Sequence, residues 1–318
     1  MRQHDPAPTE DMILSVLGGA PIGAAASRAG MSPARLAAAV ERYRAAGRAA
    51  LHDSSEEWFQ ANIRFVDYPT APEAFRAYLL PQLRQEAVGC WWFIRKHPHW
   101  RLRIQPAPDT SMADLVAETA RSLDSAVSWH VVSQWRPTRY EPETIAFGGP
   151  AGMAITHRLF HADSLDILAY DQVAGAEPNR LLEAKATSLL VLTSLLRAAG
   201  LEWGEQGDVW GQVEAKRVLP SDVPTEKVSA LADTMRQLFT LDTAPLLADG
   251  PLSPLRDWVT GMERGGQALK NAAQNNNLLL GLRAVLARHV LFHWNRMGFT
   301  IHQQAIWSRA AREAILGE

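Results

Sequence analysis

The sequence has few of the features that assign a function directly, such as clustered cysteines, an excess of charge of one sign or long apolar runs. Among its 318 residues there is one cysteine, Cys90, so cysteines alone form neither an internal disulfide nor a thiolate metal site. Lysine and arginine number 32 against 34 aspartate and glutamate, a net charge of −2 that argues against electrostatic binding of nucleic acid as the main role. No apolar run approaches the ~20 residues of a membrane span, and the first residues lack the apolar core of a secretory signal. We expect a cytoplasmic protein that binds neither DNA nor a membrane.

Motifs for cofactors and metals are missing as well. The sequence contains no Gly-x-Gly-x-x-Gly, no Gly-x-x-x-x-Gly-Lys, no nucleophile elbow and no His-Glu-x-x-His. His97 and His99 are two residues apart on a predicted turn, and no acidic third ligand lies near them in the sequence. We therefore expect no metal and no cofactor.

The composition is that of a globular protein, and its length suggests two domains. With 47% hydrophobic and 21% charged residues, the chain can bury a large core. The first fifty residues are rich in alanine, and Ser32 followed by Pro33 predicts a helix start. Leu36 and Val40 then recur at helical spacing, and Gly47 is the expected helix end. Residues 1–55 are predicted to form a small module resembling a helix-turn-helix.

The partner of this module stays open at the level of the sequence. DNA is the usual ligand of such a fold, but residues 1–50 hold six arginines against four acidic residues. Because phosphate neutralisation supplies most of the affinity for DNA, this small surplus favours peptide binding or plain packing instead.

The rest of the chain, residues 56–318, predicts an α+β domain. Strands are expected at residues 58–65, 91–95, 100–104 and 128–132, with the second and third forming a hairpin. Helices are expected at residues 72–85, which Pro81 kinks or shortens, and at 111–124. The C-terminal half is predicted to be helical, at residues 152–161, 164–170, 180–199, 225–240, 252–273 and 278–297. We expect a mixed or antiparallel sheet followed by this helical half.

Two groups of residues are candidates for chemistry. Arg101 and Arg103 are two apart on a predicted strand, so both guanidiniums project from one face. A buried face would require an anion between them, whereas an exposed face would leave them solvated. His293 shares one face of the last predicted long helix with His289 and Arg296. A histidine there either transfers protons or only caps and packs the helix end.

Four motifs in order connect these residues to a family. They are the strand pair at 91–95 and 100–103, Tyr140-Glu141-Pro142-Glu143 with Phe147-Gly148-Gly149, the segment Leu-Phe-His-Ala-Asp-Ser at 159–164, and His-Trp-Asn-Arg-Met-Gly at 293–298. From about residue 58 onward, the chain resembles the C-terminal domain of lantibiotic dehydratases, also called the thiopeptide-type bacteriocin biosynthesis domain.

The resemblance implies work on a ribosomally made precursor peptide that carries a leader. In the dehydratases this domain eliminates glutamate from glutamylated Ser or Thr, and a separate glutamyl-transfer protein would then be a partner here. A stand-alone branch instead joins two dehydroalanines into a pyridine ring in a formal [4+2] cycloaddition, with loss of water and leader peptide. A third hypothesis is a non-catalytic partner that binds the precursor peptide.

The resemblance also implies roles for residues. Arg101, Arg103 and His293 match the family's catalytic positions. Residues within or beside the motifs are expected to bind the substrate: Trp91, Arg95, Arg139, Tyr140, Asn295 and Arg296. One departure is Ala146, which stands where many dehydratases have an arginine before the aromatic-Gly-Gly turn. Arg136, Arg139 or Arg158 is the expected replacement for that cation.

Overall fold

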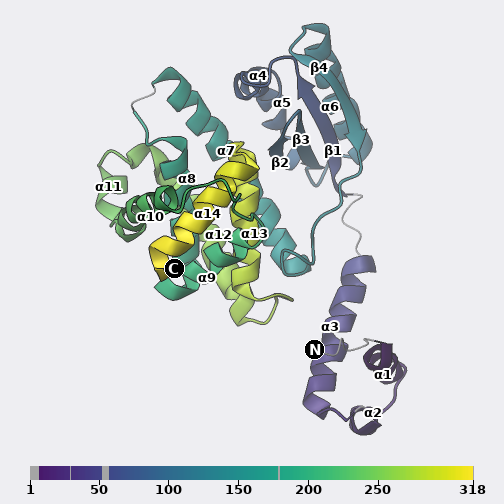
Figure 1. Ribbon diagram of the computed structural model, residues 1–318. Helices are drawn as coiled ribbons and strands as arrows, with labels where there is room; N and C mark the ends of the chain where they lie inside the picture. Colours follow the sequence, from purple (N-terminus) through teal and green to yellow (C-terminus); the bar gives the residue numbers. More distant parts are fainter. Residues whose placement is uncertain (1–6, 29, 52–56, 178–179, 318) are drawn as a thin grey trace. The chain divides into compact units, whose positions relative to one another are not determined.

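The computed structural model describes residues 7–28, 30–51, 57–177 and 180–317 (Figure 1). Contacts along the chain divide it into two units, Met1–Asp53 and Ser54–Glu318. The expected boundary between residues 55 and 56 lies outside the described residues. Within the described part, no helix combines the length and the apolar character that crossing a bilayer demands.

The N-terminal unit is a small helical module with its own core. It contains α1 (Ala7–Leu17), α2 (Ile22–Arg28) and α3 (Pro33–Leu51). Ser32 Oγ accepts a hydrogen bond from the Arg35 amide at 3.3 Å, so the predicted N-cap of α3 is confirmed. The expected end at Gly47 is wrong, because Gly47 does not adopt the positive φ of a helix-ending glycine and α3 continues past it. The helix-turn-helix-like fold is confirmed. Its buried core consists of Ile13, Val16, Ala25, Ala26, Leu36 and Val40.

The second unit contains a four-stranded antiparallel sheet in the order β2-β3-β1-β4. The strands are β1 (Phe59–Phe65), β2 (Val88–Lys96), β3 (His99–Pro106) and β4 (Val132–Thr138). β2 and β3 form the predicted hairpin. The helices α4 (Ala71–Tyr78), α5 (Leu80–Leu83) and α6 (Met112–Ser128) lie beside the sheet in Figure 1. Phe75 of α4 packs on Phe93 and Trp100, so one sheet face is apolar and covered by helices.

One local prediction in this region, the effect of Pro81, is confirmed, and another is wrong. The helix predicted at residues 72–85 is two helices that break at Leu79, because the ring of Pro81 cannot continue the hydrogen-bond ladder of α4. The strand predicted at residues 128–132 is wrong, since α6 extends to Ser128 and β4 begins only at Val132. α6 runs this far because Leu115, Leu123 and Ala126 recur at helical spacing on its buried side.

The C-terminal half is helical, as predicted. Its elements are α7 (Pro150–Ala176), α8 (Ala184–Ala198), α9 (Trp203–Glu214), α10 (Thr225–Thr240), α11 (Ala244–Ala248), α12 (Arg256–Gln274), α13 (Leu282–Met297) and α14 (Ile301–Leu316). α7 is one helix where two were predicted, because the polar residues at its centre, Asp163 and Ser164, are buried partners of other elements and not caps. α9, α11 and α14 were not predicted. The α+β class is confirmed, with an antiparallel sheet.

α7 connects the sheet to the helices by covering the edge strand β2. Ser164 Oγ accepts a hydrogen bond from the Phe93 amide at 3.4 Å, and His161 Nδ1 lies 2.8 Å from the Trp91 carbonyl oxygen. An uncovered edge would offer its free amides and carbonyls to another chain. The packing also brings the first half of α7, together with α13, next to the sheet face that α4 leaves uncovered.

Candidate active site

A cavity of about 320 Å³ lies between this second sheet face and the helices α7 and α13. Six cationic side chains line it against the two carboxylates of Glu141 and Glu143. Lys96 comes from β2, and Arg101 and Arg103 come from β3. Lys216 and Arg217 lie in the turn that follows α9, and Arg288 lies on α13. The apolar part of the wall is largely aromatic, from Trp92, Phe147, Phe160 and Phe292. The cavity therefore suits a small ligand that is anionic at one end.

Arg103 is the most deeply buried of these cations, with only 6% of its surface exposed. Its guanidinium lies over the Trp92 ring, 4.2 Å from the centroid, and its Nε donates to Gln60 Oε1 at 2.6 Å. Nη1 is buried without a hydrogen-bond partner among the described residues. Burial lowers the pKa of Arg103 to about 9. The side chain is thus fixed in place, still charged at neutral pH, and has an N–H group left for a ligand.

Arg101 stands beside Arg103 on the same wall, as the two-residue spacing predicts. Strand pairing sets Arg103 opposite Trp92 and Arg101 opposite Ile94 on β2, and both arginines line the cavity. Arg101 is partly exposed, and no described residue forms an ion pair with it. The pair is therefore one fixed, buried cation and one outer cation.

Tyr140 lines the cavity next to Arg103, whose guanidinium lies 5.3 Å from the Tyr140 ring centroid, and its hydroxyl contacts a histidine. Its hydroxyl lies 2.9 Å from His157 Nε2. Burial lowers the pKa of His157 to about 4 and raises the pKa of Tyr140 above its ordinary value. Both groups are therefore neutral at pH 7. If His157 carries its proton on Nε2 it donates to the phenol oxygen, and the phenol O–H is then available to a ligand.

The carboxylate of Glu143 closes the cavity from the same segment as Tyr140. It forms an ion pair with Arg288 of α13. A neighbouring cation, Arg217, is held by its Nε, which donates to Gln304 Oε1 of α14 at 2.8 Å. The loop that carries the Tyr-x-Pro-Glu motif is thus tied to the helical half across the cavity.

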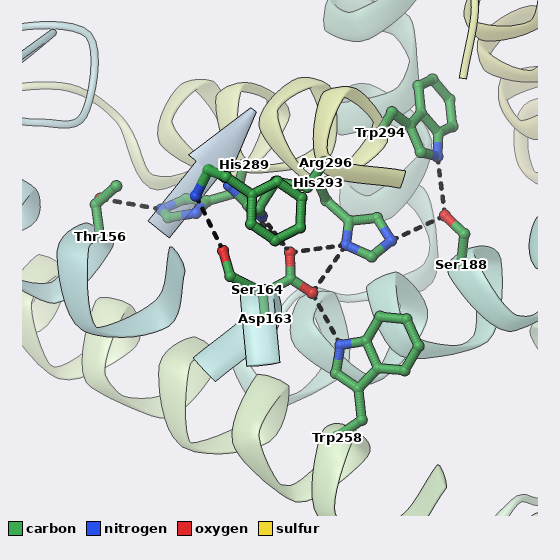
Figure 2. A network of polar contacts seen from close by, with 10 residues as sticks. Thr156, Asp163, Ser164, Ser188, Trp258, His289, His293, Trp294 and Arg296 are labelled. Atoms are coloured by element: carbon green, nitrogen blue, oxygen red, sulfur yellow. Dashed lines mark hydrogen bonds and ion pairs between the residues drawn. The ribbon is translucent and has the colours of Figure 1, made fainter. Parts of the chain in front are cut away.

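His293 is not on the cavity wall but inside a buried network (Figure 2). Its side chain is 1% exposed, and Nδ1 lies 3.0 Å from each oxygen of Asp163. Because an ionised carboxylate only accepts hydrogen bonds, Nδ1 carries a proton. Nε2 lies 3.0 Å from Ser188 Oγ. Both ring nitrogens of His293 are therefore engaged within the protein.

Asp163 of α7 is the centre of this network (Figure 2). Its carboxylate accepts from Arg296 Nε at 2.7 Å and from Trp258 Nε1 at 2.8 Å. Burial alone would raise the pKa of Asp163, but His293 and Arg296 hold it well below its ordinary value. The guanidinium of Arg296 also stacks on Phe160, 4.2 Å from the ring centroid, and Phe160 lines the cavity. The network thus lies directly behind the cavity wall.

The structure brings only part of the predicted site together. Four of the nine predicted residues line the cavity: Arg101, Arg103, Tyr140 and Asn295. Arg139 is outside the lining, and Arg296 is in the network of His293. Trp91 and Arg95 point to the other sheet face, where Trp91 packs near Phe75 and Arg95 pairs with Asp171. Their positions follow from strand alternation, because Trp91 and Arg95 project from one face of β2 and Trp92 projects from the other face.

Several lining residues were missed, and some left a signal in the sequence. Arg288 precedes Leu291 and Asn295 at helical spacing on one side of α13, and Lys96 continues the alternation of Trp92 and Ile94. Lys216 and Arg217 follow α9, a helix that was not predicted. Arg136, Arg139 and Arg158, the expected replacements for the missing arginine, do not line the cavity. Lys216, Arg217 and Arg288 do.

Comparison with known proteins identifies the family. The family model described as lantibiotic biosynthesis dehydratase C-term matches residues 58–315, and a helix-turn-helix domain model matches residues 10–56. The chain belongs to the lantibiotic dehydratase C-terminal family. This family acts on precursor peptides in the biosynthesis of ribosomally made, modified peptides, and it includes glutamate-elimination enzymes and pyridine synthases. The comparison with curated proteins found no match.

Three solved structures are similar to this chain, and the first two share its fold. The tRNA dependent lantibiotic dehydratase MibB from Microbispora sp. 107891 is 18% identical with a TM-score of 0.58, over 83% of this chain and 28% of MibB. TsrL is 16% identical with a TM-score of 0.56, over 82% of this chain and 96% of TsrL. TbtD, a pyridine synthase from thiomuracin biosynthesis, is 14% identical with a TM-score of 0.49, over 82% and 98%. This chain therefore spans about a quarter of MibB and nearly all of TsrL.

Proposed function

We propose that this chain eliminates glutamate from glutamylated Ser or Thr residues of a precursor peptide. Arg103 supports this function most directly, because it is a buried cation with an unpartnered N–H on a cavity wall and no ion-pair partner among the described residues. An uncompensated buried charge is costly, so the site is built to receive an anion. Elimination supplies one, since glutamate leaves as a carboxylate.

The cavity residues can be given roles in a balanced reaction. The carboxylate of Glu143 accepts the Cα proton of the glutamylated residue, and the phenol of Tyr140 donates a hydrogen bond to the enolate oxygen that develops. The electron pair then forms the Cα–Cβ double bond as the Cβ–O bond breaks. Glutamate departs with that oxygen, and Arg103 with Arg101 holds its carboxylate. The proton on Glu143 returns to solvent, and the peptide keeps a dehydroamino acid.

His293 has a positioning role in this proposal. Its contacts with Asp163 join α13 to α7, and these two helices supply Asn295 and Phe160 to the cavity wall. A change at His293 would act on the reaction through the placement of these residues, not through loss of a proton carrier.

Pyridine synthesis is the second candidate, and the aromatic wall favours it. Phe160 and Phe292 stack at 5.1 Å with an interplanar angle of 6°, next to Trp92 and Phe147, and such flat walls suit a six-membered ring. However, two dehydroalanines bring no anion, so the buried guanidinium of Arg103 would be left without a counter-charge. A non-catalytic peptide-binding partner is the third candidate.

Two synthetic peptides test the proposal. One carries a glutamylated serine, and the other carries two dehydroalanines at the spacing of a thiopeptide. Mass spectrometry after incubation with the purified chain should show loss of glutamic acid from the first peptide and no change in the second. Conversion of the second peptide alone would assign the pyridine synthase, and binding without conversion of either would assign the non-catalytic partner.

Matched variants connect the result to the cavity. Arg103→Met should abolish the elimination, whereas Arg121→Met should leave it unchanged. Arg121 lies on α6, on the helix-covered side of the sheet, and its side chain is exposed. Equal activity of the two variants would contradict the role of Arg103.

A further inference from the structure

The uncovered sheet face continues beyond the cavity as a row of cations. In this row Asn62 of β1 pairs with Arg101 of β3 on one side and with Arg136 of β4 on the other. Because directly opposite residues of antiparallel strands project from the same face, all three side chains lie side by side. Arg64, two residues after Asn62, projects from this face as well. We call Asn62, Arg64, Arg101 and Arg136 the basic sheet face.

No described residue neutralises the basic sheet face. Arg64 and Arg136 are exposed, and neither forms an ion pair within the described part of the chain. The guanidiniums of Arg136, Arg64 and Arg101 all act on His99 of β3. After burial, they are the next causes that lower the pKa of His99. The face therefore carries a concentrated positive charge.

Asn62 adds a second, independent sign of a ligand. It is only 9% exposed, and its Oδ1 is buried without a hydrogen-bond partner among the described residues. Buried acceptors are rarely left without a donor in proteins. A ligand for this face should thus present a hydrogen-bond donor, such as a backbone N–H, between anionic groups.

We propose that the basic sheet face binds an acidic segment of the substrate peptide, immediately next to the residue held in the cavity. The inference rests on the proposed function for the cavity, and Arg101 connects the two sites because it belongs to both. The substrate class would be peptides with Asp or Glu two or three residues apart, within a few residues of the modified Ser or Thr.

The spacing of the cations fits an extended peptide. Neighbouring strands are about 4.8 Å apart, so the backbones at Arg101 and Arg136 are separated by about 10 Å. An extended chain rises about 3.3 Å per residue, so acidic residues two or three apart span about 7–10 Å. Their carboxylates can then reach both guanidiniums while an amide between them faces Asn62. RNA is a poorer match, because three cations neutralise few phosphates and the chain is acidic overall.

Peptide binding measured by fluorescence anisotropy tests the proposal without requiring turnover. A labelled serine peptide with Glu-Ala-Glu beside the serine is compared with its Gln-Ala-Gln counterpart and with a single-stranded RNA of similar length. At low salt the acidic peptide should bind about tenfold more tightly than the neutral one, since each exposed ion pair contributes a few-fold. Arg64→Glu and Arg136→Glu should each weaken acidic binding about threefold, and Arg121→Glu on α6 should not.

Charge exchange makes the test specific. Arg136→Glu should bind a Lys-Ala-Lys peptide better than the unaltered chain does. Equal binding of acidic and neutral peptides, or RNA binding that exceeds both, would overturn the proposal. If the proposed reaction fails while acidic peptides still bind through Arg64 and Arg136, only the function of the cavity is wrong.

Discussion

Replacement of Asp163 by asparagine should be strongly destabilising, because Asp163 is the anion of a fully buried network. The change keeps the shape of the side chain but leaves Arg296, whose side chain is 2% exposed, without a counter-charge. Breaking a buried ion pair from one side typically costs about 3–5 kcal/mol. For a unit of this size each kcal/mol lowers Tm by about 2–4 °C. Asp163→Asn should thus unfold in urea with a free energy about 3–5 kcal/mol lower, and melt about 6–20 °C earlier.

The pH dependence of this loss has a definite sign. The pKa of Asp163 is held below its ordinary value, so the stabilisation by its carboxylate is complete above about pH 4 and declines at lower pH. The stability difference between the unaltered chain and Asp163→Asn should narrow by about 1 kcal/mol between pH 7 and pH 3. Paired urea titrations at several pH values measure this difference directly.

Asp166 provides a control on the same helix with the opposite sign. Burial, followed by repulsion from Asp163 and Asp257, raises the pKa of Asp166 to about 7. Above about pH 4 the unfolded chain loses the Asp166 proton while the folded chain keeps it up to about pH 7, so folding stability declines across this window. Asp166→Asn should therefore be more stable than the unaltered chain at pH 8 and about equal to it at pH 4. A loss below about 1 kcal/mol for Asp163→Asn at pH 7, or a difference that does not vary with pH, would refute the description of the network.

Three further predictions concern the site and the module. Arg103→Lys should lower kcat/KM for the glutamylated peptide more than about tenfold, because lysine lacks the planar fork that leaves an N–H for the ligand; steady-state kinetics would show it. His293→Ala should lower the free energy of unfolding by about 2–4 kcal/mol along with activity, since it opens a cavity and leaves Asp163 with one fewer donor; turnover lost with unchanged urea stability would make His293 a direct participant. Deletion of residues 1–53 should weaken precursor binding in calorimetry while sparing conversion of a short, leader-free peptide.

Regular periodicity made much of the fold predictable from the sequence. The β2–β3 hairpin, the N-cap of α3 and the helical C-terminal half follow from local signals that tertiary packing does not override. The length of α7 could not be predicted, because Asp163 in its centre looks like a helix breaker until Trp258 and Arg296 are known to bind it. The local sequence around Asp163 does not indicate which residues about a hundred positions away will contact it.

The cavity was predictable where it depends on one element and not where it depends on several. Arg101 and Arg103 share a wall because of the two-residue period of a single strand. The contributions of Lys216 and Arg217 depend on how α9 packs against α13 and α14, which no local pattern encodes.

The geometry of α13 explains why one short motif contains residues with different roles. At 3.6 residues per turn, Arg288, Leu291 and Asn295 lie on one side of this helix and line the cavity, whereas His289, His293 and Arg296 lie on another side and are buried against α7. His289 Nε2 lies 3.3 Å from Thr156 Oγ1, and the other two contact Asp163. Asn295 and Arg296 are adjacent in sequence, yet only the first can touch a ligand. In this chain the motif at 293–298 therefore belongs to a helix that lies between the cavity and the buried network of Asp163, and the role of each of its residues follows from the side of the helix on which that residue lies.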